Sequence, residues 1–124
     1  MIRPKAFGFD VFGTVVDWRT SIARESATFL ARIGRNDLDA EHFADAWRAR
    51  YQPAMAKVRE GGRDFVILDV LHREMLVDLL DHHGIDAEAL DPALVTDWAH
   101  AWHRLDAWPD SVAGLARLRA LAPV

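Results

Sequence analysis

The chain has 124 residues, of which 51% are hydrophobic, and it carries a formal net charge of −4 and no cysteine. This length fits a single domain with its own core, and a sequence without cysteine excludes disulfides, thiolate nucleophiles and thiolate metal sites. The scattered acidic residues argue against a nucleic-acid or anionic-membrane partner, and no stretch is apolar for long enough to predict a signal peptide or membrane span, so we expect a cytoplasmic protein.

The first expected element is a buried strand over residues 5–10, KAFGFD, a short run rich in aromatic residues that ends in a glycine turn. After it, apolar residues recur at spacings of three and four, which predicts helices for most of the remaining chain. A first helix is expected to end near Gly34, and a second at Gly61 and Gly62.

Three further helices complete the expected pattern. One runs from about residue 64 to residue 83 and stops at Gly84. The next begins where Asp91 supplies an N-cap and Pro92 fills the first helical position. The last covers residues 111–121 and leads into a second stretch with the character of a strand.

The end of the sequence, LRALAPV, reads as a helix followed by the first residues of that strand. One strand at the front and the start of another at the back cannot satisfy their backbone groups as a sheet. We therefore expect the sequence to be part of a longer protein. We also expect the 124-residue chain alone to be inactive and either oligomeric or poorly folded.

Asp10 stands at the carboxyl end of the expected strand, where ligands bind in open α/β sheets. Gly13 permits a tight turn after it, and Thr14 can direct a hydroxyl and a backbone N–H to the same place. A carboxylate held by donors stays ionised and aimed, which suits a nucleophile. The alternative is that Asp10 only caps the next turn, as aspartates after strands often do. The residue types alone leave both interpretations open.

The stretch FDVFGTVVDW closely resembles the first motif of the haloacid dehalogenase superfamily, a hydrophobic strand followed by Asp-x-x-Gly-Thr-hydrophobic-x-Asp. The matching residues are Asp10, Gly13, Thr14, Val15 and Asp17. The resemblance implies an α/β fold with a Rossmann-type core and an inserted all-α four-helix cap. It also implies that the carboxylate of Asp10 attacks the substrate and forms a covalent aspartyl intermediate. Asp17 is expected to cap the first helix rather than to react.

Phe12 selects between branches of this superfamily. Phosphatases usually have a second aspartate at that position, because an alkoxide leaving group needs a proton. A halide ion leaves without one, so Phe12 fits the branch of type II (S)-2-haloacid dehalogenases, which form (R)-2-hydroxy acids without a cofactor or metal. Two alternatives stay open: a Mg²⁺-dependent phosphatase or phosphonatase with Mg²⁺ at Asp10, and a non-catalytic helical module that associates with itself.

The segment WRARYQ resembles the Trp-Arg-x-x-Gln segment of the family's cap, although Tyr51 stands where the family often has glutamine. Arg48 falls on the position of the arginine that faces the active site. The substrate, the departing halide and the nucleophile are all anionic, so a cation is needed there to stabilise the transition state. The alternative for Arg48 is an ordinary solvated helix arginine.

The resemblance gives a complete set of site residues and of domain limits. The catalytic set is Asp10, Thr14 and Arg48, and the substrate-binding set is Arg48, Val11, Phe12, Trp18 and Phe65. Phe65 either lines the pocket for the substrate's alkyl group or packs in the core, and Trp18 either screens the entrance or packs beneath the cap.

The segments DFVILDVL and AWPDSVAGLARLR resemble the stretches that close the cap and return to the core. The domain limits are therefore 1–20 for the first core strand and nucleophile loop, 21–106 for the cap, and 107–124 for the return to the core. Only the first strand and the start of the second would be present, since the family's later motifs would follow Val124. The resemblance also implies a homodimer and a small 2-haloalkanoic acid as substrate.

Asp97, His100 and His103 recur at steps of three on one expected helix, a spacing that can hold a metal ion. Trp98 and Trp102 alternate with them. The simpler interpretation is that the three polar residues form the solvated flank of an amphipathic helix.

Overall fold

Helices carry most of the chain in the computed structural model, which describes residues 2–124. The α-helices are α1 (Trp18–Arg32), α2 (Ala40–Ala49), α3 (Tyr51–Arg59), α4 (Leu68–His82), α5 (Pro92–Ala99) and α6 (Ser111–Arg119). Two short 3₁₀ helices, η1 (Ala87–Ala89) and η2 (His100–His103), flank α5. Two strands, β1 (Val16–Asp17) and β2 (Asp106–Ala107), pair antiparallel, with Val16 opposite Ala107 and Asp17 opposite Asp106.

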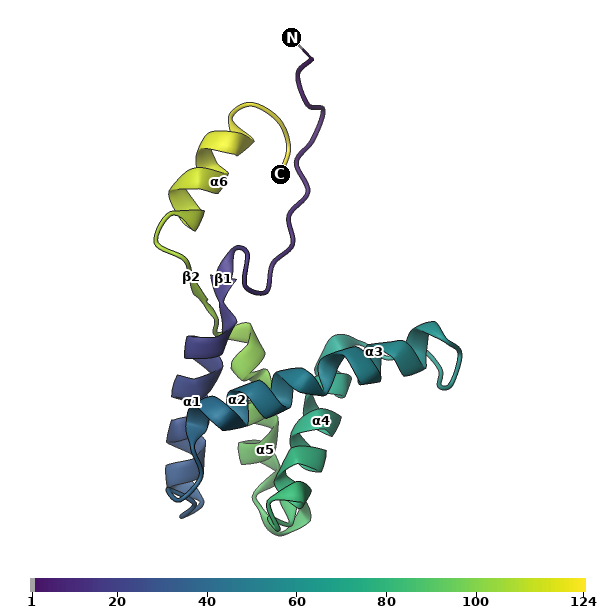
Figure 1. The fold of residues 1–124 in the computed structure, drawn as a ribbon, viewed down its shortest axis with the longest axis vertical. Helices are drawn as coiled ribbons and strands as arrows, with labels where there is room; N and C mark the ends of the chain where they lie inside the picture. Colours follow the sequence, from purple (N-terminus) through teal and green to yellow (C-terminus); the bar gives the residue numbers. More distant parts are fainter. Residues whose placement is uncertain (1) are drawn as a thin grey trace.

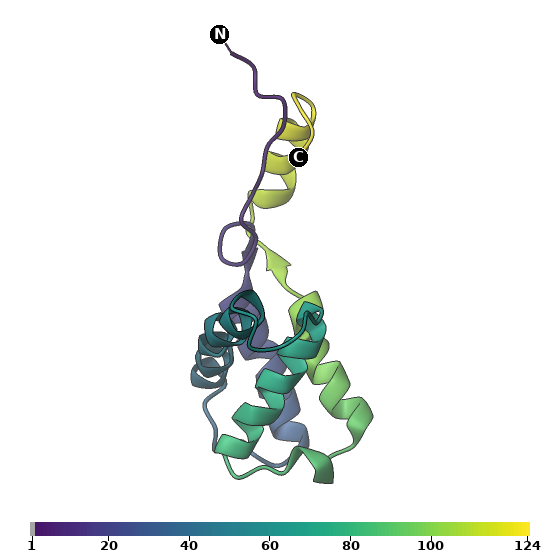
Figure 2. The same ribbon diagram turned by 90° about the vertical axis from the view of Figure 1, so that its right-hand side faces the viewer.

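The β1–β2 pair separates the molecule into two parts (Figures 1 and 2). On one side α1, α2, α4 and α5 pack together into a helical body, from which α3 projects. On the other side α6 lies beside the N-terminal segment. The chain enters the helical body through β1 and leaves it through β2.

The core of the helical body is built from large aromatic side chains. Trp47 and Trp98 are fully buried, and the Phe43 ring stacks on Trp98 with its centroid 5.3 Å away. The indole N–H of Trp98 donates to Ser26 Oγ at 3.4 Å, and that of Trp47 to the carbonyl of His72 at 3.2 Å. Each such side chain stabilises the fold by about 1.5–3 kcal/mol through burial, and the hydrogen bonds remove the cost of the buried N–H groups.

Local signals set most helix ends where the sequence predicted them. The Asp91 carboxylate accepts from the backbone N–H of Ala93 at 3.0 Å and so caps α5. The Asp17 carboxylate accepts from the N–H of Thr20 at 3.1 Å and caps α1, as expected. Gly34 and Gly84 follow α1 and α4 with positive φ angles of 75° and 72°, the left-handed conformation that ends helices.

The expected second helix is instead two helices, α2 and α3, that meet at Arg50. Pro53 explains the break, because proline has no N–H to bond the carbonyl four residues earlier and its ring crowds that carbonyl. The next helix begins at Leu68, later than expected, and α6 ends at Arg119, slightly earlier than expected.

The expected strand over residues 5–10 is not formed as a strand among the described residues. The segment is extended, and its backbone pairs with the chain end through one hydrogen bond, from Phe7 N–H to the Pro123 carbonyl at 2.8 Å. A strand needs a ladder of such bonds to a neighbour. The two segments nevertheless lie side by side (Figures 1 and 2).

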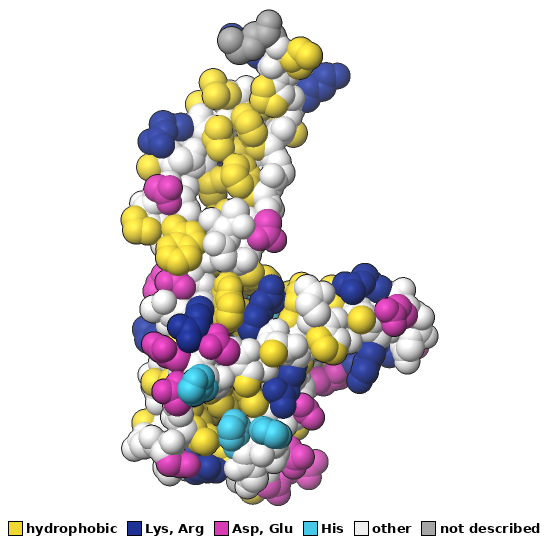
Figure 3. Space-filling model, in the orientation of Figure 1, with side chains coloured by type: hydrophobic (Ala, Val, Ile, Leu, Met, Phe, Trp, Pro, Cys, Tyr) yellow, Lys and Arg dark blue, Asp and Glu magenta, His cyan; other side chains and the backbone are white. Residues whose placement is uncertain are grey.

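Hydrophobic side chains gather on the surface of the part of the molecule that contains α6 and the N-terminal segment, whereas charged side chains cover the helical body (Figure 3). The exposed apolar residues here are Ile2, Phe9, Val11, Val112, Leu121 and Val124. Within residues 2–124, no helix is both long and apolar enough to cross a membrane.

His72, on α4, is a titratable side chain in the core and is only 2% exposed. Burial lowers the pKa of His72 to about 4; the positive charges of Arg48 and His103 act in the same direction, and Asp69 opposes them. The folded protein therefore holds this imidazole neutral well below the pH at which it would become charged in the unfolded chain.

This depressed pKa predicts a specific loss of stability in acid. Between pH 6.5 and 4, His72 is protonated in the unfolded chain but stays neutral in the folded protein. The free energy of unfolding therefore falls as the pH is lowered through this range. The His72→Phe variant keeps a ring against Trp102 and should lose about 3 kcal/mol less than the parent between pH 7.5 and pH 4. Urea unfolding followed by circular dichroism measures both losses. Equal losses would show that His72 is protonated normally in the folded state.

Candidate active site

The turn after Asp10 brings the hydroxyl of Thr14 to its carboxylate: Thr14 Oγ1 donates to Asp10 Oδ2 at 2.8 Å. The carbonyl of Val11 closes the turn by accepting backbone N–H groups of residues 14, 15 and 16 at 3.2, 3.0 and 3.3 Å. Gly13 has a φ of 89°, which glycine adopts without the steric cost of a Cβ. The two side chains expected to act together are thus adjacent.

The carboxylate of Asp10 is exposed, and Thr14 is the one hydrogen-bond donor to it within residues 2–124. The backbone N–H of Thr14 was also expected to face Asp10, but it donates to Val11 because the tight turn directs it inward. No backbone N–H of the described part of the chain bonds the Asp10 carboxylate, so Asp10 does not serve as a turn cap. Its second oxygen, Oδ1, is left accessible.

Phe12 connects this turn to the helical body. Its half-buried ring meets the edge of Trp102, from η2, with centroids 5.6 Å apart and planes at 71°. It meets Tyr51, from α3, at 6.5 Å and 84°. Edge-to-face packing of this kind stabilises aromatic pairs beyond the area they bury. The position of Asp10 relative to the helices therefore depends on the ring two residues after it.

Arg48, in the last turn of α2, lies among aromatic rings. Its guanidinium carbon is 4.2 Å from the ring centroid of Tyr51, 5.4 Å from that of Phe12 and 5.8 Å from that of Trp18. Its Nη1 atom is buried and has no hydrogen-bond partner among the residues that the structure describes. Arg48 is therefore not a solvated surface arginine. A buried cationic N–H without a partner is an open position for an anion.

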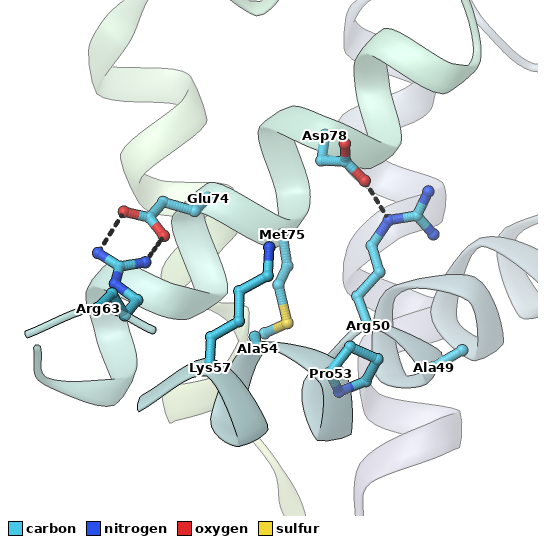
Figure 4. Close-up of a pocket in the computed structure, with 9 residues that line it drawn as sticks. All are labelled: Ala49, Arg50, Pro53, Ala54, Lys57, Arg63, Glu74, Met75 and Asp78. Carbon is cyan, nitrogen blue, oxygen red and sulfur yellow. Dashed lines mark hydrogen bonds and ion pairs between the residues drawn. The ribbon is translucent and has the colours of Figure 1, made fainter. Parts of the chain in front are cut away.

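Arg50, two residues later, shows the contrast. Its Nε donates to Asp78 at 2.7 Å, and its Nη1 donates to the carbonyl of Ala46 at 3.0 Å. Arg50 lines a groove between α3 and α4 in which a second pair, Arg63 with Glu74, is also formed (Figure 4). The arginines in this groove are already matched by carboxylates, so it is not the candidate site.

The remaining expected site residues differ in their positions. Trp18, at the start of α1, stacks on Trp102 with ring centroids 6.1 Å apart and planes at 25°. It thus belongs to the cluster of aromatic rings around Arg48, together with Phe12, Tyr51 and Trp102. Val11 lies next to Asp10 and is half exposed. Phe65 is 80% exposed in the irregular segment before α4. The structure brings Phe65 neither into the core nor among the aromatic rings around Arg48.

His72 and Trp102 also belong to this cluster, and neither was identified as a site residue from the sequence. The ring of His72 stacks on Trp102 with centroids 4.7 Å apart and planes at 14°. His72 occupies a position on the apolar stripe of α4, four residues after Leu68 and three before Met75. A histidine on such a stripe was the available signal.

The alternative metal site is not formed. Asp97 pairs with Arg104 at 3.2 Å, and His103 pairs with Asp69 at 2.6 Å. The hydrogen bond from His103 is the main cause of the lowered pKa of Asp69. Residues 2–124 contain no group of three histidine, aspartate or glutamate side chains placed to hold a metal ion. Asp97 lies on α5 and His103 on η2, and both side chains are exposed.

The fold is similar to that of several solved structures. The defluorinating L-2-haloacid dehalogenase Rha0230 has a TM-score of 0.88 and 51% identity, covering 92% of this chain and 46% of its own. The L-2-haloacid dehalogenase PA0810 has a TM-score of 0.84 and 41% identity, covering 95% of this chain and 49% of its own. An L-2-haloacid dehalogenase from Xanthobacter autotrophicus has a TM-score of 0.74 and 27% identity, with coverages of 96% and 44%.

A further structure from Xanthobacter autotrophicus, of an L-2-haloacid dehalogenase with chloropropionic acid covalently bound, is 25% identical and has a TM-score of 0.68. Neither a family model nor a curated protein matches the sequence. The chain spans about half the length of the solved structures it matches. The match in fold confirms the expected haloacid dehalogenase-like class with its helical cap. By its identity to two of these enzymes and its shared fold, the chain belongs to the haloacid dehalogenase superfamily, and it is similar to about half of an L-2-haloacid dehalogenase chain.

Proposed function

We propose that this protein is a hydrolytic dehalogenase that converts (S)-2-haloalkanoic acids into (R)-2-hydroxy acids through an ester on Asp10. The observation that carries the proposal is the environment of Arg48. Its buried, unpartnered Nη1 lies in an aromatic cluster that Phe12, from the Asp10 turn, helps to form. A cation is thus held without a counter-ion close to the nucleophile's own loop.

The first step is a displacement at C2 of the substrate. Oδ1 of Asp10 attacks C2, the new C–O bond forms as the carbon–halogen bond breaks, and the halogen leaves with the bonding electrons as halide. The hydrogen bond from Thr14 holds Oδ2 and orients the carboxylate. Phe12 carries no acidic proton, and none is needed because a halide ion is a stable leaving group.

In the second step, water attacks the carbonyl carbon of the aspartyl ester, which releases the 2-hydroxy acid and restores the Asp10 carboxylate. Negative charge is present on the nucleophile, the substrate carboxylate and the departing halide, so the charge of Arg48 favours the transition state. The substrate has no phosphoryl group for a metal ion to bridge, and the proposal therefore includes no metal or cofactor. The covalently bound chloropropionic acid in the enzyme from Xanthobacter autotrophicus supports the same chemistry here.

The proposal includes the division of the chain into core (1–20 and 107–124) and cap (21–106). The position of β2 supports the limit at 106/107, because the chain leaves the helical body there, whereas the limit at 20/21 falls within α1, three residues after β1 ends. Residue 1 lies outside the described residues. A homodimer and a cytoplasmic location are further parts of the proposal, and light scattering and cell fractionation test them.

The nucleophile is tested by Asp10→Asn in the protein expressed from its complete reading frame. An amide keeps the shape of the carboxyl group but cannot attack C2, so chloride release from 2-chloropropionate should fall below detection while the circular dichroism stays unchanged. A single turnover of the parent in H₂¹⁸O should place the label in the Asp10 carboxylate, as mass spectrometry of its peptide measures.

Asp17→Asn is the matched control, because asparagine caps helices as well as aspartate does and activity should persist. Label that appears in the product and not in Asp10 would contradict the ester mechanism. Phosphate release from p-nitrophenyl phosphate that requires Mg²⁺, without halide release, would favour the phosphatase alternative. Self-association without either activity would favour the helical module.

The role of Arg48 is tested by Arg48→Ala and Arg48→Lys. Loss of a charge-assisted contact of about 1.5–3 kcal/mol should lower kcat/KM for 2-chloropropionate by about 10- to 100-fold, through both a lower kcat and a higher KM. Lysine should restore only part of the activity, because its ammonium lacks the planar fork of donors. Arg50→Ala is the control, and its kinetics should stay within about twofold of the parent. Similar kinetics for Arg48→Ala and Arg50→Ala would remove Arg48 from the mechanism.

A further inference from the structure

The nucleophile turn, residues 10–16, is bonded to a part of the chain about 95 residues later. The Gly13 carbonyl accepts from the indole N–H of Trp108 at 3.1 Å. The Val15 carbonyl accepts from Ser111 Oγ at 2.7 Å and from the backbone N–H of Trp108 at 3.1 Å. The turn is thus tied to the start of α6 and to the residues just before it.

These bonds lie on both sides of Thr14, whose hydroxyl donates to Oδ2 of Asp10 at 2.8 Å. The position of that hydroxyl depends on the backbone before and after it. Gly13, with a φ of 89°, is the residue of the turn whose backbone is least restricted by its own side chain. Its carbonyl is one of the two that are held. The bonds from residues 108 and 111 therefore restrain the donor that orients the nucleophile.

Packing does little to fix the turn on this side. A hollow of about 170 Å³ lies between the turn and α6, and its lining includes Thr14 and Val15 from the turn and Ser111 and Leu115 from α6. The aromatic contacts of the turn, through Phe12, are made with the helical body instead. Hydrogen bonds rather than close packing hold the turn to α6.

Burial does not require the bond from Trp108. Its side chain is 38% exposed, so water could accept from its indole N–H. Trp47 and Trp98 are fully buried, and their N–H groups need the partners that they have within the protein. The bond from Trp108 to Gly13 is thus one that the core does not need, and its effect falls on the turn.

We propose that Trp108 and Ser111 are positioning residues for the nucleophile. By holding the two carbonyls that flank Thr14, they keep its hydroxyl on Oδ2 of Asp10, so that Oδ1 stays aimed at C2 of the substrate. Neither side chain takes part in the bond changes of the reaction. The inference rests on the proposed function and adds to it two residues outside the aromatic cluster around Arg48.

The position of the Thr14 hydroxyl can be measured without any reaction, in the isotope-labelled protein expressed from its complete reading frame. Three-bond couplings from the Thr14 methyl carbon to the backbone N and C′ atoms report its χ1 rotamer, and Thr14→Ser assigns the signal. Trp108→Phe and Ser111→Ala should each move these couplings from the values of one rotamer towards averaged values. The couplings of Thr20 and Thr28, on α1, should keep their parental values. Unchanged Thr14 couplings in both variants overturn the proposal.

The effect on the reaction is measured as the rate constant of chloride release in a single turnover of 2-chloropropionate. Each substitution should lower this rate constant by about tenfold, because a less restrained carboxylate reaches the attack geometry less often. A merely structural role would lower the folded fraction, and so the amplitude of chloride release, without changing its rate constant. That result overturns the proposal, as does a parental rate constant in a variant whose Thr14 couplings have changed.

Two variants serve as controls. Ser111→Thr keeps a hydroxyl for the Val15 carbonyl and should stay within about twofold of the parental rate constant. Thr28→Ala removes a hydroxyl that also donates to a backbone carbonyl, that of Arg24 at 3.3 Å, but lies away from the turn. It should keep the parental rate constant. A loss in Ser111→Thr as large as in Ser111→Ala would show that the hydroxyl is not what matters at this position and would overturn its role.

The two proposals fail separately. A parent protein that releases no halide from 2-chloropropionate or 2-bromopropionate refutes the proposed function, and the Thr14 couplings still decide whether Trp108 and Ser111 hold the turn. A parent that releases halide, with couplings and rate constants that neither substitution changes, refutes only the positioning role.

Discussion

The contact of Phe12 with the helical body is the interaction on which the candidate site depends. Its ring packs against Trp102 and Tyr51 and lies beside the Arg48 guanidinium, and Asp10 lies two residues before it. Without this contact the exposed turn would be held to the helices mainly through β1, whose ladder to β2 has two residue pairs. Packing of one aromatic side chain thus helps to position the Asp10 turn relative to the helical body that carries Arg48.

Arg48 has a buried nitrogen without a partner, whereas several other arginines of the helical body are paired with carboxylates. Arg19, Arg35, Arg63 and Arg104 are each matched by a carboxylate, and each has a raised pKa caused first by that hydrogen bond. Arg48 is bordered by three aromatic rings instead. Cation–π contacts recover part of the lost hydration, but they leave its Nη1 free for an anionic ligand. A buried cationic nitrogen without a partner lowers the stability of the fold, but it provides a binding position that is formed before a ligand arrives.

His72 illustrates how the core and the site share residues. Its ring fills the hydrophobic core against Trp102, and its backbone carbonyl accepts the indole N–H of the fully buried Trp47. The same burial that keeps the imidazole neutral makes it a hydrogen-bond donor without charge. A substitution at this position therefore changes the packing of the core and the aromatic cluster that contains Trp102 at the same time.

The sequence by itself determined the features that depend on neighbouring residues: the turn from Asp10 to Thr14, the helix caps at Asp17 and Asp91, and the family. The tertiary structure alone decided which distant side chains meet. It placed Trp102 against both Phe12 and His72, left Phe65 in solvent, and left residues 5–10 extended without a ladder. The reason is physical, because turns and caps are closed by hydrogen bonds across a few residues. Ring stacking and strand pairing need partners that only the packing of separate elements supplies.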